Sequence, residues 1–328
     1  MRTRKQLAEN RALCTDKALG CLAGLAIGDT IGDQARSPEN HIRYGITRDL
    51  YGNQSSSTDD TEFALLTALA CIETGGRADP RGDGRPVARA RAQRAGPGSE
   101  GGEPAARRGR KPAARHHAPY SGIDNCDNYD DGAAMRVAPI GVICAGDPAR
   151  AAHLAAVDAE ISHAQDGVWG AQAIAASIAV AMVDGSVEEV IAAGMDCIPE
   201  DSWLARWLAR GFAICDAAGD LESAWDWLHD DLWTAVRCSN PEALAETYAL
   251  FRLTDGDFEK GVIAAANFGR DADTLAALVG ALAGALHGGA SIPEGWIEKT
   301  RRPAGTCLPF AAELDIVTVA EDLAALIR

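Results

Sequence analysis

Two short acidic clusters, more than two hundred residues apart in the chain, carry the residue types that bind hard metal ions. Residues 57–61 have the sequence Ser-Thr-Asp-Asp-Thr, and residues 271–274 have the sequence Asp-Ala-Asp-Thr. Each cluster opens an apolar run with helical spacing and combines hydroxyl groups with two carboxylates. If the fold brings the clusters together, their oxygens form the kind of ligand set that Mg²⁺ and Mn²⁺ prefer.

The carboxylates of these clusters explain why a cation would be needed. Four carboxylates within a few ångströms repel one another at neutral pH, so without a cation their pKa values rise or the cluster separates. A divalent ion removes this conflict, and an open coordination position lets it bind and acidify a water molecule. The clusters therefore predict a hydrolase, in which Asp60 or its neighbour Asp59 takes the proton of that water.

A simpler interpretation is that each cluster only starts a helix. Asp59 followed by Glu62 fits a capping box, and Asp271 or Asp273 ahead of Leu275 would complement a helix dipole. For either cluster alone, this interpretation is favoured. A cap needs only one acidic or hydroxyl residue, however, and both clusters supply more, so the pair favours a metal site.

Four sequence blocks, in this order, resemble the ADP-ribosylglycohydrolase family, which includes the dinitrogen reductase-activating glycohydrolases. The blocks cover residues 20–32, 58–61, 132–141 and 267–274. The resemblance implies one all-α domain over residues 1–328, folded as an orthogonal helical bundle. It also implies a cleft with Mg²⁺ or Mn²⁺, expected as two ions, where a metal-activated water attacks the anomeric carbon of a ribose and cleaves its glycosidic bond.

The resemblance assigns roles to residues in these blocks and to one histidine. The metal ligands that it implies are Thr58, Asp59, Asp60, Asp271, Asp273 and Thr274. The substrate-binding residues that we expect with it are Asp29, Gly132, Ala133, Met135, His163 and Gly269. Two of these assignments have alternatives, because Asp29 could instead cap the first helix and His163 could be a helix-start histidine without a role in binding. The expected substrate is an ADP-ribosylated protein or a small ribosylated molecule.

Two positions depart from the pattern of the family. Members often carry a glutamate seven residues after the aspartate that corresponds to Asp29, but this chain has Arg36. Arginine cannot bind a cation, so either Asp33 or Glu39 takes over, or the chain handles a different leaving group. In the middle block, residues 130–132 are Asp-Asp-Gly instead of Gly-Asn-Gly. These departures leave two alternatives open: a non-catalytic relative that binds ADP-ribose, and a hydrolase of a small ribosylated metabolite or nucleoside.

Composition limits the class of protein and its partners. The chain has 328 residues, 47% of them hydrophobic, which is enough for a large buried core. A formal net charge of −16 argues against general nucleic-acid binding. The nine cysteines contain no C-x-x-C pair, and no apolar stretch has the length of a membrane span. We therefore expect a cytoplasmic protein with reduced thiols and no membrane partner.

Helical spacing of apolar residues dominates the chain outside one segment. It predicts helices over residues 16–28, 62–72, 168–183, 202–212, 221–229, 241–251, 258–266, 274–286 and 311–327. Residues 77–119 are instead rich in Arg, Gly, Pro and Ala, with ten arginines and a single large aliphatic residue, Val87. Such a segment cannot bury a hydrophobic face, so we expect it to be a disordered low-complexity insertion within the domain, or the product of a shifted reading frame.

Overall fold

The computed structural model describes residues 1–52, 55–76 and 118–328. Within these residues, every regular secondary-structure element is a helix. The predicted all-α fold is therefore confirmed. The expected insertion at residues 77–119 lies almost wholly outside the described residues and stays a prediction, as does the single domain around it. The long helices are α2 (Arg11–Arg36), α4 (Asp59–Thr74), α8 (Pro148–Ala159), α9 (Asp166–Ala181), α11 (Trp203–Ala218), α12 (Leu221–Asp231), α13 (Asn240–Leu253), α14 (Phe258–Phe268) and α15 (Ala272–His287).

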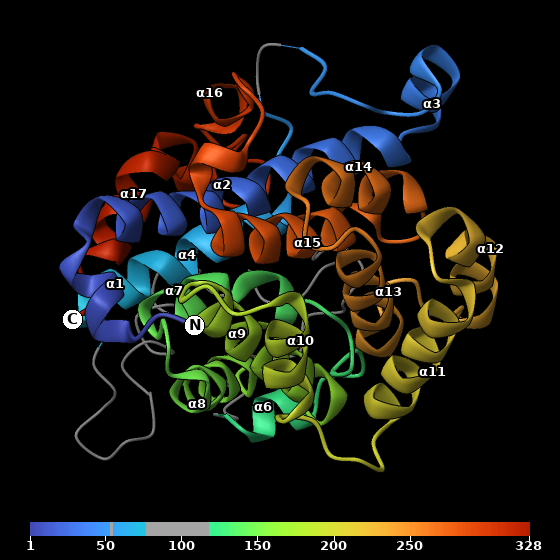
Figure 1. Ribbon diagram of the computed structural model, residues 1–328, viewed down its shortest axis with the longest axis horizontal. Helices are drawn as coiled ribbons and strands as arrows, with labels where there is room; N and C mark the ends of the chain where they lie inside the picture. Colours follow the sequence, from blue (N-terminus) through green and yellow to red (C-terminus); the bar gives the residue numbers. More distant parts are fainter. Residues whose placement is uncertain (53–54, 77–117) are drawn as a thin grey trace.

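Shorter helices and 3-10 turns complete the bundle. They are α1 (Arg4–Glu9), α3 (Pro38–Tyr44), α6 (Tyr120–Ile123), η1 (Ala134–Arg136), α7 (Ala138–Ile143), α10 (Val187–Met195), η2 (Gly289–Ser291), α16 (Trp296–Thr300), η3 (Pro309–Glu313) and α17 (Ile316–Ala324). The two chain ends lie close together beside α1 (Figure 1), where the Arg4 Nε donates a hydrogen bond of 2.9 Å to the Arg328 carbonyl oxygen.

Helices α2 and α15 cross the centre of the molecule side by side (Figure 1). Every fourth residue of α2 along the contact is a glycine. These glycines face small residues of α15, which runs antiparallel to α2. A methyl group on Gly28 would collide with the Ala276 carbonyl oxygen, and one on Gly24 would collide with that of Gly280. The backbones can approach this closely only because the side chains are absent. The facing pairs are Gly20 with Gly284, Gly24 with Gly280, Gly28 with Ala276 and Gly32 with Ala272.

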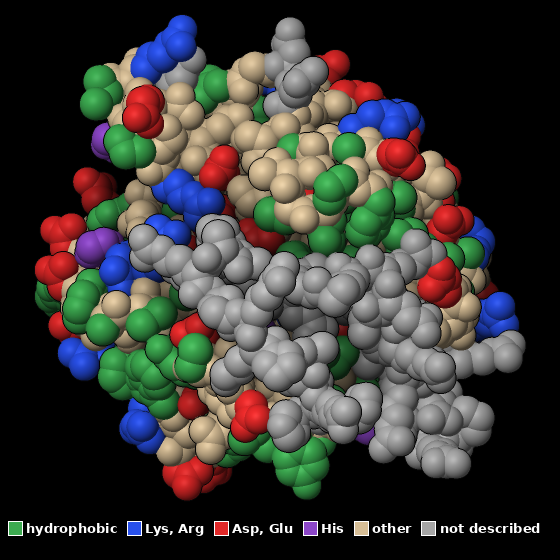
Figure 2. Space-filling view, turned by 180° about the vertical axis from the view of Figure 1, so that it is seen from behind, with side chains coloured by type: hydrophobic (Ala, Val, Ile, Leu, Met, Phe, Trp, Pro, Cys, Tyr) green, Lys and Arg blue, Asp and Glu red, His purple; other side chains and the backbone are tan. Residues whose placement is uncertain are grey.

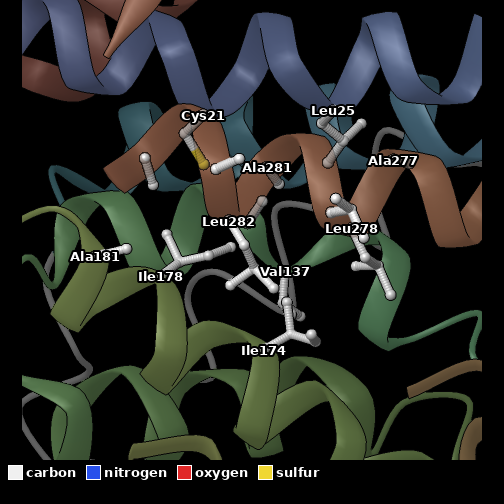
Figure 3. Close-up of a cluster of buried hydrophobic side chains, with 14 of the residues drawn as sticks. Cys21, Leu25, Val137, Ile174, Ile178, Ala181, Ala277, Leu278, Ala281 and Leu282 are labelled. Carbon is white, nitrogen blue, oxygen red and sulfur yellow. The ribbon is translucent and has the colours of Figure 1, made fainter. Parts of the chain in front are cut away.

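The hydrophobic core lies beneath this pair, between α2, α15 and α9 (Figure 3). Leu25 from α2, Leu278 and Leu282 from α15, and Ile174 and Ile178 from α9 are all buried there. Helix α9 is buried on nearly every side, as its continuous run of small apolar residues predicts.

The structure corrects several helix boundaries expected from the sequence. Helix α2 continues past Gly28 to Arg36, because its glycines are contact points with α15 and do not end the helix. The expected helix over residues 311–327 is wrong: η3 ends at Glu313, and α17 starts after Asp315, whose side chain accepts from the backbone N–H of Val317. Helices α8 and α10 were not predicted, although Ser186 and Glu189 form a capping box at the start of α10.

Charged side chains of both signs lie on the surface of the described residues (Figure 2). In the described part of the face shown in Figure 2, Lys and Arg side chains are interspersed with acidic ones and form no extended basic patch of the kind that binds nucleic-acid phosphates. Within the described residues, every helix is too short or too polar to cross a bilayer.

Candidate metal centre

Three buried carboxylates from three helices converge next to the contact of α2 with α15. Asp29 comes from α2, Asp60 from the first turn of α4, and Asp273 from the first turn of α15. One oxygen of each lies within 4.8 Å of the others. In the described part of the chain, no other group of three or more such side chains meets this condition. The fold thus brings a residue from each of the two acidic clusters together, and adds Asp29 to them.

Asp29 is held in place by the start of α4. Its Oδ2 accepts hydrogen bonds from the backbone N–H groups of Thr58 (2.8 Å) and Thr61 (3.2 Å) and from the Thr61 hydroxyl (2.5 Å). Its Oδ1 accepts from the Thr58 hydroxyl at 2.7 Å. These four bonds fix the carboxylate rotamer and join α2 to α4. Asp29 is therefore not a cap of its own helix, which was the alternative interpretation of this residue.

The clusters do not cap their helices in the expected way. Thr58 is the N-cap of α4 and Asp271 is the N-cap of α15, but neither side chain makes a capping hydrogen bond. Glu62, the expected partner in a capping box, is buried and instead accepts from the backbone N–H groups of Thr306, Cys307 and Leu308. The interpretation of the first cluster as a capping box is therefore wrong.

Two carboxylate oxygens of the converging group have no hydrogen-bond partner among the described residues. They are Oδ1 of Asp60 and Oδ1 of Asp273, and both side chains are at least 96% buried. A buried acceptor without a donor destabilises a fold by about 1–3 kcal/mol, and more when it is charged. Such oxygens are rare in native structures, and a divalent cation would satisfy both at once. The donor set thus fits Mg²⁺ or Mn²⁺.

The pKa values of these carboxyl groups point the same way. Burial raises the pKa of Asp29 to about 7, although the bonds from Thr61 and Thr58 oppose the shift. Burial and the nearby charge of Asp271 raise the pKa of Asp273 to about 8, against the opposing effect of Arg36. Burial, followed by the charges of Asp29 and Asp273, raises the pKa of Asp60 well above its ordinary value. Three negative charges are therefore unstable here without a cation.

The other predicted ligands lie around this group. Asp271 faces arginines: its Oδ1 is 3.4 Å from Arg237 Nε and 4.0 Å from Arg36 Nη1. Its Oδ2 accepts a long bond of 3.5 Å from the Thr274 hydroxyl. Asp59 is half-buried at the first position of α4. Asp271, Thr274 and Asp59 therefore lie outside the converging group.

Arg36 contacts the group itself, which the sequence did not predict. Its Nη1 lies 2.5 Å from Asp273 Oδ2, and its Nε and Nη2 donate to Asp33 Oδ1 at 3.2 Å and 3.0 Å. Asp33 and Glu39, the residues that we considered as replacements for the missing glutamate, do not join the three carboxylates. They line an open cleft of about 680 Å³ together with Arg36 and Arg237. The cleft therefore reaches the carboxylate group through Arg36.

The middle loop lies over a buried histidine. His163 is 2% exposed, and its two ring nitrogens contact Asp130 Oδ1 (2.5 Å) and Ser162 Oγ (2.8 Å). Asp130 Oδ1 also accepts from the Gly132 backbone N–H at 3.0 Å. His163 thus supports the loop from within, while Gly132 is partly exposed.

Two further candidates of this loop are packed inside. Ala133 is fully buried, and Met135 packs against Phe63, Leu66 and Leu308. Their side chains therefore serve packing in this structure, and a role of Ala133 and Met135 in substrate binding remains a prediction.

The turn before α15 sets the position of Asp271. Gly269 has φ of 93° and Arg270 has φ of 58°, so two successive residues have positive φ. Arg270 is an unusual residue for this conformation, and its guanidinium is held by Glu242 (2.5 Å and 3.0 Å) and by the Thr234 carbonyl oxygen (2.6 Å). The sequence block contains Arg270, but nothing in the sequence identifies its partner on α13.

Comparisons with known proteins show the family of the chain. The family model described as ADP-ribosylglycohydrolase matches residues 10–328. A protein of Archaeoglobus fulgidus, itself uncharacterized, is 32% identical over 86% of this chain and 91% of its own length. The ADP-ribosyl-[dinitrogen reductase] glycohydrolase of Rhodospirillum rubrum is 27% identical over 87% of this chain and 90% of its own length. The ADP-ribosylarginine hydrolase Tri1 of Pseudomonas putida is 25% identical over 87% and 74% of the two chains.

A solved structure supports the fold. An ADP-ribosylglycohydrolase-related protein complex contains a chain that superposes with a TM-score of 0.60, covering 96% of this chain and 99% of the other. The two sequences are 23% identical, so this likeness concerns the helical architecture alone.

Proposed function

Because the chain belongs to the ADP-ribosylglycohydrolase family, whose members hydrolyse glycosidic bonds, we propose that it cleaves the glycosidic bond of an ADP-ribosyl substrate with Mg²⁺ or Mn²⁺ held by Asp29, Asp60 and Asp273. The observation that supports this most strongly is the pair of unpartnered oxygens on Asp60 and Asp273, buried within one group of carboxylates. A structural role alone would leave these acids without a compensating donor.

The residues of the site have different roles in the proposed reaction. A divalent ion, when bound, neutralises the carboxylates and supplies Lewis-acid chemistry toward a water and the ribose hydroxyls. Thr58 and Thr61 keep Asp29 in one orientation, so that its position does not depend on the substrate. Asp60 takes the proton of the attacking water, with the half-buried Asp59 as the alternative base. Participation of Asp271 and Thr274 as ligands remains a prediction.

The cleft favours an anionic ligand of nucleotide size. Its volume of about 680 Å³ lies in the range of small-molecule sites. Arg36 and Arg237 line it and can donate to phosphate oxygens. We therefore infer that the phosphates of ADP-ribose lie in this cleft, with the backbone at Gly132 and Gly269 as further candidate contacts. The Rhodospirillum rubrum and Pseudomonas putida relatives act on an ADP-ribosylated protein and on ADP-ribosylarginine by name, which makes an ADP-ribosylated protein our first candidate substrate.

A substrate panel tests the activity directly. Purified protein is incubated with Mn²⁺ or with EDTA against proteins ADP-ribosylated on arginine or serine, ADP-ribosylated guanidines and nucleosides. We expect release of free ADP-ribose that EDTA abolishes. Release of base from nucleosides alone would favour the metabolite hydrolase instead. Binding of ADP-ribose without turnover of any substrate would favour the non-catalytic relative.

Variants of Asp60 and Asp273, the two carboxylates with an unpartnered oxygen, test the site. Asp60→Asn and Asp273→Asn keep the size of the side chain but remove an ionisable ligand, so we expect each to lower kcat by at least about a hundredfold, a typical loss for a group that contacts the reacting atoms. Mn²⁺ affinity measured by calorimetry should fall in parallel. Glu39→Gln, in the same cleft but outside the carboxylate group, is the matched control and should retain Mn²⁺ binding. Full turnover in both site variants would contradict the proposal.

A cytoplasmic location also remains a prediction. All nine cysteines lie within the described residues and are free thiols, a state that a reducing compartment maintains.

A further inference from the structure

Arg36 places a guanidinium beside two acids of the carboxylate site. The side chain comes from the last residue of α2 and is anchored by Asp33 one turn earlier. From there its Nη1 reaches Asp273 Oδ2 at 2.5 Å and lies 4.0 Å from Asp271 Oδ1. A guanidinium is always charged at physiological pH, so it is a permanent positive charge between these two acids.

Only one of the two oxygens of Asp273 has a partner among the described residues. Oδ2 is paired with Arg36, whereas Oδ1 is buried and has no partner among the described residues. Asp60 Oδ1 likewise has no partner among the described residues, and one oxygen of Asp273 lies within 4.8 Å of an oxygen of Asp60 and of Asp29. One oxygen of Asp273 is therefore neutralised by Arg36, whereas the other has no positively charged or donor partner among the described residues.

Two guanidinium groups face Asp271, which also shares a hydrogen bond with the carboxyl group of Asp131. Arg237 Nε lies 3.4 Å from Asp271 Oδ1, so two guanidinium groups face this one carboxylate. A divalent ion bound between Asp271 and Asp273 would have to displace Arg36 and would remain close to Arg237. Like charges at this distance oppose binding, whereas no arginine is paired with Asp29 or Asp60 in the described structure.

We propose that the Arg36 guanidinium takes the place of a second divalent ion, so that this chain binds a single Mg²⁺ or Mn²⁺ between Asp29, Asp60 and Asp273. This inference rests on the proposed metal-dependent function and revises the expectation of two ions. It also assigns Arg36 a positioning role, because its guanidinium holds Asp273 in place while the residue lines the cleft.

The test is the number of Mn²⁺ ions bound at equilibrium, measured by dialysis and metal analysis of the full chain. We expect about one Mn²⁺ per chain for the unmodified protein, with the EPR spectrum of an isolated ion. Arg36→Glu replaces the guanidinium with a carboxylate and should bind two ions, with the spectrum of a coupled pair. The matched control is Arg237→Glu, which reverses the same charge beside Asp271 but leaves Asp273 paired with Arg36.

The outcomes separate this inference from the proposed function. One ion in the unmodified and Arg237→Glu proteins and two in Arg36→Glu support the inference. Two ions in the unmodified protein overturn it while leaving the metal-dependent function intact. No bound Mn²⁺ in any of these proteins overturns the metal site and the inference with it. One ion in the unmodified protein and still one in a folded Arg36→Glu protein, as judged by its circular dichroism spectrum, would also overturn the role of Arg36.

Discussion

Asp29 shows how one residue can serve both the fold and the site. Its two oxygens accept four hydrogen bonds from Thr58 and Thr61, and one of the same oxygens lies within reach of Asp60 and Asp273. The sequence indicated Asp29 as a candidate for substrate or water contact, but its donors could not be predicted. They lie about thirty residues further along the chain, at the N-cap and in the first turn of α4, and only the packing of α4 against α2 brings them to Asp29.

The hydroxyl of Thr61 offers the clearest test at the residue scale. Thr61→Val removes the 2.5 Å bond to Asp29 but keeps the shape of the side chain. Because this bond is made to a buried carboxyl group, we expect the free energy of unfolding to fall by about 1.5–3 kcal/mol. Mn²⁺ affinity should also fall, since Asp29 becomes free to rotate. Chemical denaturation and calorimetry measure the two effects.

Thr67→Val provides the matched control on the same helix. Thr67 is fully buried in α4, but its hydroxyl has no partner among the described residues. The same substitution there removes an unsatisfied polar group, so stability should be unchanged or higher. Equal losses of unfolding free energy in Thr61→Val and Thr67→Val would show that the hydrogen bond from Thr61 to Asp29 does not stabilise the fold.

At the scale of the element, the glycine contact of α2 with α15 sets the geometry of the centre. Asp29 follows Gly28, and Asp273 follows Ala272, which faces Gly32. The two carboxylates can meet only because the helices approach within backbone contact along this line. Glycines that would otherwise weaken a helix therefore help to form the proposed metal site, although they supply no ligand.

Gly28→Ala tests this role of the contact. A methyl group there would collide with the Ala276 carbonyl oxygen, which is backbone and cannot move aside as a side chain can. We expect a loss of about 2–3 kcal/mol in the free energy of unfolding and a weaker affinity for Mn²⁺, because the helices must separate. Gly211→Ala in α11 is the control, since its methyl group would lie 3.4 Å from the nearest atom and should be neutral or stabilise by up to about 1 kcal/mol. A stable Gly28→Ala protein with normal Mn²⁺ affinity would contradict this account.

Helical spacing predicted most long elements but not their ends. Helices α4, α9, α13 and α15 lie within a few residues of the expected ranges, because each carries a strong apolar pattern. Asp315 interrupts the expected C-terminal helix because its side chain caps α17, and a cap inside an apolar pattern is a weak signal. The full length of α2 was missed for the opposite reason: Gly28 suggests an end, while packing against α15 requires it inside the helix.

At the scale of the whole molecule, the sequence predicted which residues could meet but not how they would be neutralised. The two acidic clusters suggested a shared cation, and Asp60 and Asp273 do converge. The pairing of Arg36 with Asp273 depends on where α2 ends relative to the first turn of α15. Glu242 and Arg270 likewise belong to helix and turn segments whose contact is set by the fold. Charge pairs across distant elements carry no local pattern, so sequence analysis could not find them.

The buried carboxylates should make the stability of the metal-free protein depend on pH in an unusual direction. The pKa values of Asp29 and Asp273 are raised to about 7 and about 8 in the folded protein, whereas an unfolded chain has aspartates near 4. Between about pH 4 and 8 the folded state therefore binds more protons than the unfolded state, so stability falls as pH rises through this range. A bound divalent ion replaces those protons, and its own binding strengthens as pH rises.

Thermal unfolding at two pH values distinguishes these effects. In EDTA we expect Tm to fall by about 5 °C or more between about pH 5.5 and 8.0. Saturating Mn²⁺ should raise Tm by more at the higher pH than at the lower one, where it competes with bound protons. Asp273→Asn carries no proton to lose at this position, so its Tm in EDTA should fall by less over the same range. A Tm of the metal-free protein that is constant or rises with pH would mean that the three carboxylates are stable in their ionised form without a cation. An ion at this centre would then no longer be required.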